Sequence, residues 1–469
     1  MQSKHEYDAI IIGAGIGGLV CGCYLAKAGM KTLIVEKNAK AGGYCTSFTR
    51  NGFRFDACVH FLGSLRDDGI LNKVMHDLDL KNHIKIARNP ISDIIFSKDY
   101  NFSFYNEMDK TINELQYYFP SEKKSIKKFF YYISKIKGYD FSELRQKTLQ
   151  EVLNHYFNND HLKTLLGFPI LGNTGILPSQ VSALRAMTIY KEFIFDGGYY
   201  IPSGVQELPN TLVKKIIEYG GYVLLDTPVK KIIVQKNEVK GVITDKGDLF
   251  TARYIVSNSD AHHTFSKLIG RDNTPKALQT TLLNLKPSLS MFVLYLGTKN
   301  LISDFPSHAT IWYLNDYDLE KLYKYHIEGA TKDIKWFLGY YNPCEKTILC
   351  FFNVPYISKE YWKNNKHRLA ELLIKKIDKV IPNTSNSICY KNIATPDTML
   401  RMTSNYQGAA YGWAGSVDQF SIGGLSQATP IKNFFLTSHW TTSVQGIPGV
   451  AYLGGSTAKL ILKKKYKRK

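Results

Sequence analysis

The sequence predicts an α/β fold in which a parallel βαβ unit near the N-terminus is joined to a larger α+β region inserted later in the chain. Residues 7–12 form a short β-branched run that ends at a glycine turn. Residues 16–28 have a helical pattern that stops at Gly29, and residues 31–36 read as a second buried strand. Strand, turn, helix and strand in this order make one βαβ unit. With 469 residues, the chain can form two domains, or one domain with a large insertion.

The glycine turn has the spacing of a dinucleotide-binding loop. Gly13 begins a Gly-Ala-Gly-Ile-Gly-Gly run that follows the first strand and opens the helix. Gly13 permits the sharp turn, Gly15 lets the backbone approach a pyrophosphate, and Gly18 lets helix and strand pack closely. A pyrophosphate would meet the free N–H groups at the helix N-terminus. Glu36, at the end of the second strand, can accept hydrogen bonds from ribose hydroxyls and would repel a 2′-phosphate. We therefore predict a Rossmann-like dinucleotide site.

The segment after Glu36 indicates which dinucleotide is bound. Lys37 is followed by the pair Gly42-Gly43 and by Thr46. This glycine pair resembles the extended fingerprint of FAD enzymes in the glutathione-reductase-like and amine-oxidase-like superfamily, where the second loop passes close to the ribityl chain. The resemblance implies FAD as the cofactor and a glutathione-reductase-like FAD-binding domain.

Longer segments resemble one family within that superfamily. Residues 52–63 read Gly-Phe-Arg-Phe-Asp-Ala-Cys-Val-His-Phe-Leu-Gly, similar to the G-x-x-F-D-x-G-x-H-x-x-G stretch of carotenoid isomerases and retinol saturases, which belong to the phytoene desaturase family. Cys58 stands where the family usually has glycine. Residues 197–221 resemble the family's linker back into the FAD domain, and residues 405–412 resemble its glycine-rich strand over the flavin. Residues 434–458 resemble its C-terminal FAD motif.

The resemblance implies an FAD-dependent oxidoreductase or isomerase that desaturates, saturates or isomerises a long hydrophobic polyene, such as a carotenoid, retinoid or polyketide chain. His60 and His439 are the candidate catalytic residues, because both motifs should approach the flavin and either ring could tune it or shuttle a proton. A structural histidine bonded to the backbone is the alternative for each. Ser438-His439 replaces a common Gly-Asp, so one cofactor hydrogen bond must come from another group. The predicted cofactor-binding residues are Gly13, Gly15, Gly17, Gly18, Glu36, Lys37, Gly42, Gly43, Thr46, Val229, Ser438, Gly446, Gly449 and Val450.

The formal net charge of +20 predicts attraction to polyanions. No nucleic-acid-binding motif accompanies it, so an anionic membrane surface is the expected partner. Residues 120–138 place apolar side chains at helical spacing among lysines, as in a helix lying in an anionic interface, although a core-facing helix has the same pattern. The basic segment 463–469 could also contact a membrane, or act as a solubilising end. The apolar positions are Ile126, Phe129, Phe130, Ile133 and Ile136, and the lysines are 123, 124, 127, 128, 135 and 137.

Other classes of site find little support. The seven cysteines include no C-x-x-C pair, which indicates free thiols in a reducing, cytoplasmic compartment. Residues 9–26 are uncharged, but their glycine fingerprint argues against a membrane span. The neighbouring His262 and His263 lack surrounding carboxylates or cysteines, so no metal site is expected. No hydrolase motif occurs. The chain is expected in the cytoplasm, peripherally associated with membranes.

Two alternatives to the polyene enzyme stay open: a flavin-dependent amine or other small-molecule oxidase, and a non-catalytic flavin- or nucleic-acid-binding protein. The sequence identifies neither the substrate nor the electron donor or acceptor.

The motifs and patterns along the chain also predict the domain boundaries. We expect three FAD-binding parts at 1–84, 197–275 and 401–462, a helical substrate or membrane region at 85–196, a substrate domain of sheet and helices at 276–400, and a basic tail at 463–469.

Overall fold

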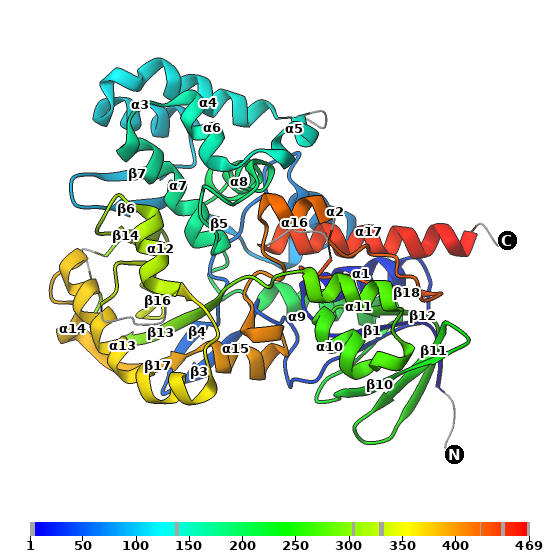
Figure 1. Ribbon diagram of the computed structural model, residues 1–469. Coiled ribbons are helices and arrows are strands. Elements are labelled where there is room, and N and C mark those ends of the chain that lie inside the picture. The colour runs from blue at the N-terminus through cyan, green and yellow to red at the C-terminus, as the bar shows by residue number, and fades with distance from the viewer. Residues whose placement is uncertain are drawn as a thin grey trace.

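Two seven-stranded sheets organise the chain, and helices cover or bridge them (Figure 1). The computed structural model describes residues 5–136, 140–302, 305–327, 333–422, 424–441 and 446–466. Residues 137–139, which include Lys137, residues 442–445 of the C-terminal motif and the last three residues of the basic tail lie outside the described residues.

The first sheet contains the predicted βαβ unit. Its strand order is β10-β11-β12-β1-β2-β9, with β18 beside β12, and β1 pairs in parallel with both β2 and β12. The α/β prediction of a Rossmann-like unit is therefore confirmed. The strands are β1 (His5–Ile12), β2 (Thr32–Val35), β9 (Tyr222–Leu224), β10 (Val229–Gln235), β11 (Glu238–Thr244), β12 (Leu249–Ser257) and β18 (Phe434–Leu436).

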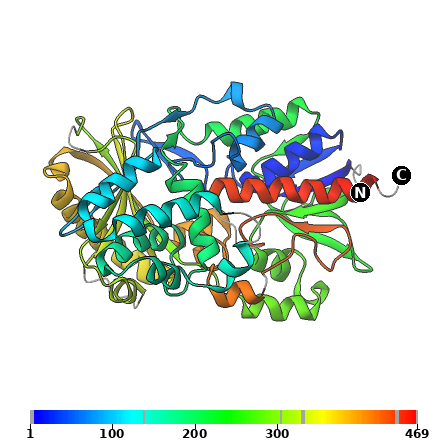
Figure 2. The same cartoon turned by 90° about the horizontal axis from the view of Figure 1, so that it is seen from above.

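Both faces of this sheet are buried, which explains the continuous apolar run in β1. Alternate side chains of a strand point to opposite faces. Ile11 packs in the core formed with α1, α9 and α17, whereas Ile10 and Ile12 pack in the core on the other face, beside α10 and α11. The long helix α17 runs alongside α1 in both views (Figures 1 and 2). These helices are α1 (Ile16–Lys27), α2 (Ile70–Asp77), α9 (Glu207–Glu218), α10 (Ala261–His263), α11 (Lys276–Asn284) and α17 (Gly446–Tyr466).

The second sheet has the order β17-β13-β16-β15-β14-β6-β7. All neighbours are antiparallel except β14 and β6. Its strands are β6 (Ile91–Phe96), β7 (Asn101–Tyr105), β13 (Ser290–Thr298), β14 (Thr310–Leu314), β15 (Trp336–Asn342), β16 (Thr347–Val354) and β17 (Ile388–Ala394). Nearby helices are α12 (Leu319–Ile327), α13 (Lys359–Val380), α14 (Thr384–Ser387) and α15 (Pro396–Thr403), and the short pairs are β3 (Ser47–Arg50) with β4 (Phe53–Asp56) and β5 (Ala87–Arg88) with β8 (Tyr199–Tyr200).

Two local expectations were wrong. The stretch from residue 85 was expected to be helical, but it begins with the β6–β7 hairpin, where Phe102 and Phe104 alternate with more exposed neighbours. The lysines and asparagines around this hairpin make the alternation of apolar and polar residues, which is typical of a strand, hard to recognise in the sequence. The glycine-rich segment 405–412 was expected to be a strand. It instead contains a 3₁₀ turn, Tyr406–Gly408, because Gln407 and Gly408 have positive φ values of 54° and 64°.

A bundle of helices fills the region between residues 108 and 194. Helix α4, proposed from its pattern to lie in a membrane interface, turns its apolar side inward: Ile126, Phe129, Phe130 and Ile133 are fully buried in the protein core. The core-facing alternative therefore describes this helix. Among the described residues, no helix is both long and apolar enough to cross a bilayer. The bundle comprises α3 (Met108–Tyr118), α4 (Lys123–Lys135), α5 (Asp140–Gln146), α6 (Leu149–Tyr156), α7 (Asp160–Thr174), α8 (Ala183–Ile189) and the π-helical turn η3 (Tyr190–Ile194); a further short helix, α16, spans Val417–Ile422.

Candidate functional site

A single cavity of about 600 Å³ joins the glycine turn of the first sheet to the apolar side chains of the second sheet and the helical bundle. Its volume lies within the range of small-molecule and cofactor sites. At one end it is bordered by the β1–α1 turn, the end of β2 and the start of β10. At the other end it is bordered by α8, η3, β13 and β16.

The glycine turn forms a cradle at the N-terminus of α1. Gly13 has a positive φ of 94°, and Gly15 is an N-cap without a side chain, so the first N–H groups of α1 have no side-chain cap. A Cβ at Gly15 would lie 2.8 Å from Nδ2 of Asn258. Gly13, Gly15 and Gly17 line the cavity, whereas Gly18 packs against the carbonyl of Gly13. Free donors beside glycine backbone fit a pyrophosphate.

Glu36 is buried at the end of β2, and its carboxylate connects the glycine turn to the segment that follows β2. One of its oxygens accepts a hydrogen bond from the backbone N–H of Ala14 at 2.7 Å, and the other accepts one from the N–H of Asn38 at 2.9 Å. Lys37 also lines the cavity, and its ammonium group donates to the hydroxyl of Ser404 at 2.7 Å. Burial lowers the pKa of Lys37 below its usual value. The carboxylate thus braces the glycine turn from the side where a ribose would bind.

The glycine pair Gly42-Gly43 lies at the same end of the cavity as the glycine turn. Gly42 and Gly43 have φ values of 128° and 62°, a conformation that favours glycine, and both line the cavity. The N–H of Gly42 donates to the carbonyl of Ala14 at 2.8 Å, so the pair rests directly on the first glycine turn. Thr46 does not line the cavity; its hydroxyl donates to the carbonyl of Gly43 at 3.1 Å and stabilises the loop.

The remaining predicted cofactor residues come from distant parts of the chain. Val229 at the start of β10 and Ser438 after β18 both line the cavity, and so do two residues of α17. Gly449 is buried in α17 but does not border the cavity. The two lining residues of α17 are Gly446 and Val450.

Asn258 lines the site and Thr437 lies next to Gly17 behind it, although neither was among the predicted site residues. Asn258 follows β12, lines the cavity and donates to the carbonyl of Gly13 at 3.3 Å. Thr437 is fully buried next to Gly17, and its hydroxyl has no hydrogen-bond partner among the described residues. Both residues directly follow strands that are parallel to β1, and ligands bind at the carboxyl ends of such strands. Their position directly after a strand is the feature of the sequence that could have identified both residues.

His60 lines the cavity as a neutral ring with both nitrogens engaged. Nδ1 lies 3.2 Å from the carbonyl of Cys58, which can only accept, so Nδ1 carries the proton. Nε2 lies 3.4 Å from the hydroxyl of Thr310, from which it accepts. Burial lowers the pKa of His60 to about 4, and its ring centroid lies 4.6 Å from that of Tyr340. At neutral pH this side chain holds its position without carrying a charge.

His439 reaches the cavity from the C-terminal motif, so both predicted catalytic histidines border the same cavity. Burial, and then the charge of Arg185, lowers the pKa of His439 to about 4. Its ring lies beside those of Tyr44 and Trp440, with centroids 6.3 and 5.6 Å away. It too is neutral at pH 7.

The far end of the cavity is apolar and aromatic. Phe61 and Phe193 meet edge to face with centroids 6.1 Å apart. The Phe193 ring also rests against the first residue of α17: a Cβ at Gly446 would lie 2.4 Å from its Cζ. The other side chains that line this end include Ile189, Met291, Phe351, Met399 and Tyr411. Such a lining fits a hydrophobic ligand and excludes water.

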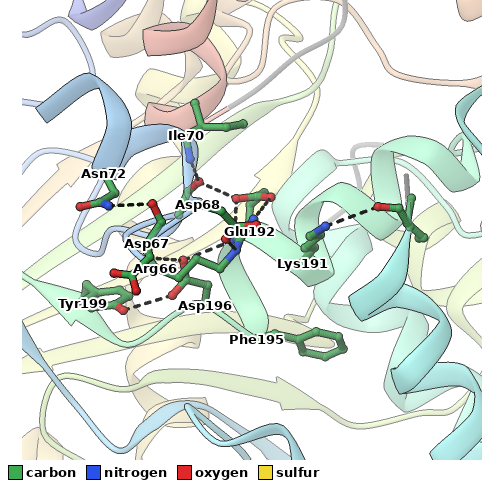
Figure 3. A network of polar contacts seen from close by, with 12 residues as sticks. Arg66, Asp67, Asp68, Ile70, Asn72, Lys191, Glu192, Phe195, Asp196 and Tyr199 are labelled. Atoms are coloured by element: carbon green, nitrogen blue, oxygen red, sulfur yellow. Dashed lines mark hydrogen bonds and ion pairs between the residues drawn. The ribbon is translucent and has the colours of Figure 1, made fainter. Parts of the chain in front are cut away.

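A charged network joins the loop after His60 to the turn that carries Phe193 (Figure 3). Arg66 donates to both carboxylate oxygens of Glu192, at 2.8 and 2.9 Å, and its backbone N–H donates to Asp196 at 2.9 Å. Glu192 belongs to the η3 turn that carries Phe193. A Cβ at Gly63 would lie 2.1 Å from the carbonyl oxygen of Glu192, so the loop preceding Arg66 also packs tightly against the turn. The network therefore fixes one wall of the cavity.

Comparisons with known proteins agree with this architecture. Residues 11–78 match a family described as an NAD(P)-binding Rossmann-like domain, and residues 105–274 match one described as GDP dissociation inhibitor. The chain is 25% identical to the all-trans-retinol 13,14-reductase of Danio rerio, over 92% of this chain and 82% of that protein. It is 26% identical to the chloroplastic prolycopene isomerase of Daucus carota, over 96% and 79%.

A solved structure of putrescine oxidase bound to putrescine has the same fold. It superposes with a TM-score of 0.67 over 98% of this chain and all of that chain, at 14% identity. This likeness concerns the arrangement of the sheets and helices alone. The sequence relatives, in contrast, extend over nearly the whole chain, including the segments that carry both histidines.

Proposed function

Because the chain belongs to the phytoene desaturase-like family of oxidoreductases and isomerases, which act on CH–CH groups, we propose that it is an FAD-dependent enzyme that desaturates, saturates or isomerises a long hydrophobic polyene. One observation carries the proposal. The same cavity is bordered at one end by the glycine cradle and at the other by apolar and aromatic side chains. A cofactor and a hydrophobic chain can therefore meet inside it, away from water.

The residues around the cradle fit FAD. The uncapped N-terminus of α1, with Gly13, Gly15 and Gly17, would hold the pyrophosphate. Glu36 would bind the ribose, and Val229 would lie at the adenine side. When bound, FAD supplies hydride exchange with a carbon of the substrate. The residues proposed to contact the rest of the cofactor are Lys37, Gly42, Gly43, Ser438, Gly446 and Val450, with Gly18, Thr46 and Gly449 supporting them from behind.

The protein's own contribution to the reaction is to orient the polyene and to exclude water from it. Phe61, Phe193 and Phe351 present flat apolar surfaces along which a conjugated chain can lie. His60 and His439 are the proposed catalytic residues. We propose that His60, whose two nitrogens are already engaged, presents the face of its ring to the reacting segment, and that His439 offers it a polar edge. Because both rings are neutral, neither delivers a proton as an imidazolium ion.

Membrane contact forms a second part of the proposal, since polyenes dissolve in bilayers. The buried apolar side of α4 cannot serve as the contact. The basic end of α17, with exposed Lys463 and Lys464, is the remaining candidate. We propose a cytoplasmic enzyme that binds anionic membranes through this end.

The amine-oxidase alternative rests on the shared fold alone. Anaerobic incubation of oxidised and of reduced enzyme with candidate polyenes, followed by mass analysis, tests the proposal. Loss of two hydrogens would identify a desaturase, gain of two a saturase, and an unchanged mass with altered retention an isomerase. Turnover of an amine in place of every polyene would overturn the proposal.

A further inference from the structure

Arg185 is a buried cation for which the described part of the chain offers no hydrogen-bond partner. It lies on α8 and is only 5% exposed. None of its three guanidinium nitrogens has a hydrogen-bond partner among the described residues. An uncompensated buried charge costs several kcal/mol, and arginine cannot escape that cost by losing its proton at ordinary pH. Such a group indicates that an anion completes the site when a ligand binds.

The surroundings of Arg185 connect it to the cavity. Ile189, which lines the cavity, follows Arg185 by four residues and so lies on the same side of α8, one turn further along. Tyr411 and His439, which also line the cavity, both interact electrostatically with Arg185. Arg185 itself does not line the cavity, but it lies near the lining residues Tyr411 and His439 and one helical turn from Ile189.

The chain also leaves specific room for this guanidinium group. A Cβ at Gly415 would lie 1.6 Å from Nη1 and 2.3 Å from Cδ and Cζ of Arg185. The side chain is thus pressed against glycine backbone, where any other residue would displace it.

We propose that Arg185 binds a carboxylate at the end of the hydrophobic substrate, so that this chain prefers a polyene acid to the corresponding alcohol. The inference rests on the proposed function, because the apolar cavity must hold the chain that carries the carboxylate. A guanidinium group pairs with a carboxylate through two parallel hydrogen bonds, which gives direction as well as attraction. Binding would neutralise the buried charge, and the acid would enter with its carboxylate first.

The test compares all-trans-retinoic acid with all-trans-retinol, and palmitic acid with hexadecanol, for binding to the full-length, flavin-loaded protein by quenching of tryptophan fluorescence. The wild type is expected to bind each acid about tenfold to a hundredfold more tightly than its alcohol. Arg185→Met should bind acid and alcohol equally, and Arg185→Lys should keep part of the preference. Arg253→Met removes an exposed charge far from the cavity and should change nothing.

A second readout needs no ligand. Removing an unpaired buried charge relieves its desolvation cost, so Arg185→Met is expected to raise the thermal midpoint of the ligand-free protein. A fall in that midpoint would mean that the guanidinium group already has a structural partner, and would overturn the inference. A changed midpoint potential of the bound flavin in Arg185→Met, with no change in acid binding, would assign the charge to the cofactor and would also overturn it.

The outcomes separate the inference from the proposed function. Equal binding of acid and alcohol by the wild type would reject the role of Arg185 while leaving polyene binding intact. Arg185-dependent binding of palmitic acid without binding of either retinoid would support the carboxylate site and reject the polyene function.

Discussion

Arg66 holds the carboxylate of Glu192 with two parallel hydrogen bonds of 2.8 and 2.9 Å, and thereby ties the loop after His60 to the turn that carries Phe193. Glu192 is 7% exposed and Asp196 is 4% exposed; Arg66 compensates the charge of Glu192, whereas Asp196 lies near both Arg66, at 3.4 Å, and Arg88, at 3.6 Å. The bond links two parts of the chain that are 126 residues apart. Neither Arg66 nor Glu192 lines the cavity, so the pair supports the cavity wall from outside it.

The first prediction concerns this pair. Arg66→Met leaves the buried carboxylate of Glu192 without its main partner, while Asp196 keeps Arg88. The loss is expected to cost about 3 kcal/mol of stability and to loosen the wall at Phe193. The thermal midpoint should fall, and the affinity for a polyene ligand should weaken. Arg50→Met, at an exposed arginine, is the matched control. An unchanged midpoint in Arg66→Met would show that the pair is structurally dispensable.

The second prediction concerns the glycine cradle. Gly15→Ala would place a methyl group 2.8 Å from Nδ2 of Asn258, inside the space where the pyrophosphate is proposed to bind. The purified variant should be folded but should contain much less flavin, measured as visible absorbance per protein. Gly339→Ala is the control, since its Cβ would meet its nearest neighbour at an ordinary 3.4 Å. Full flavin content in Gly15→Ala would argue against this position for the cofactor.

The third prediction is a pH dependence of stability. The pKa of His60 is about 4 in the folded protein, against an ordinary value of 6.5. The folded state therefore binds fewer protons between these values, so stability rises with pH across this window and is lost as pH falls through it. His60→Phe keeps the aromatic packing and removes the titration. Its thermal midpoint should fall less than that of the wild type between about pH 7 and pH 4.5.

Other buried histidines contribute to the same acid sensitivity, so the effect of His60→Phe is partial. His367→Phe, at an exposed position, serves as the control and should leave the pH dependence as it is in the wild type. If His60→Phe lost stability in acid as steeply as the wild type, His60 would have to be able to take up a proton in the folded state.

The fourth prediction separates the two basic candidates for membrane contact. Replacing Lys463, Lys464 and Lys465 by glutamine should reduce co-sedimentation with vesicles that contain anionic lipid, because each charge near such a surface contributes about 1 kcal/mol. The same triple replacement at lysines 123, 124 and 127 of α4 removes equal charge and should have little effect. Equal partition of the wild type with neutral and anionic vesicles would end the membrane proposal.

The sequence by itself determined the nucleotide end of this protein. The Gly13–Gly18 turn, Glu36 and the glycine pair are local signals, because a tight turn, an uncapped helix start and a positive φ each require a particular residue type within a few positions. Both histidines were also found from their motifs, and the structure brings them to one cavity.

Only the tertiary structure decided the rest. The apolar positions of α4 have the same helical spacing whether they face a membrane or a core, and packing against other helices settled the choice. Phe193 and Ile189 belong to no motif; they line the cavity because Arg66 and the η3 turn place them there. Arg185 looks ordinary in the sequence, since its burial, and the absence of a partner for it among the described residues, depend on segments far away in the chain. Local patterns determine turns and strands, whereas charge compensation and cavity shape arise only when distant segments pack together.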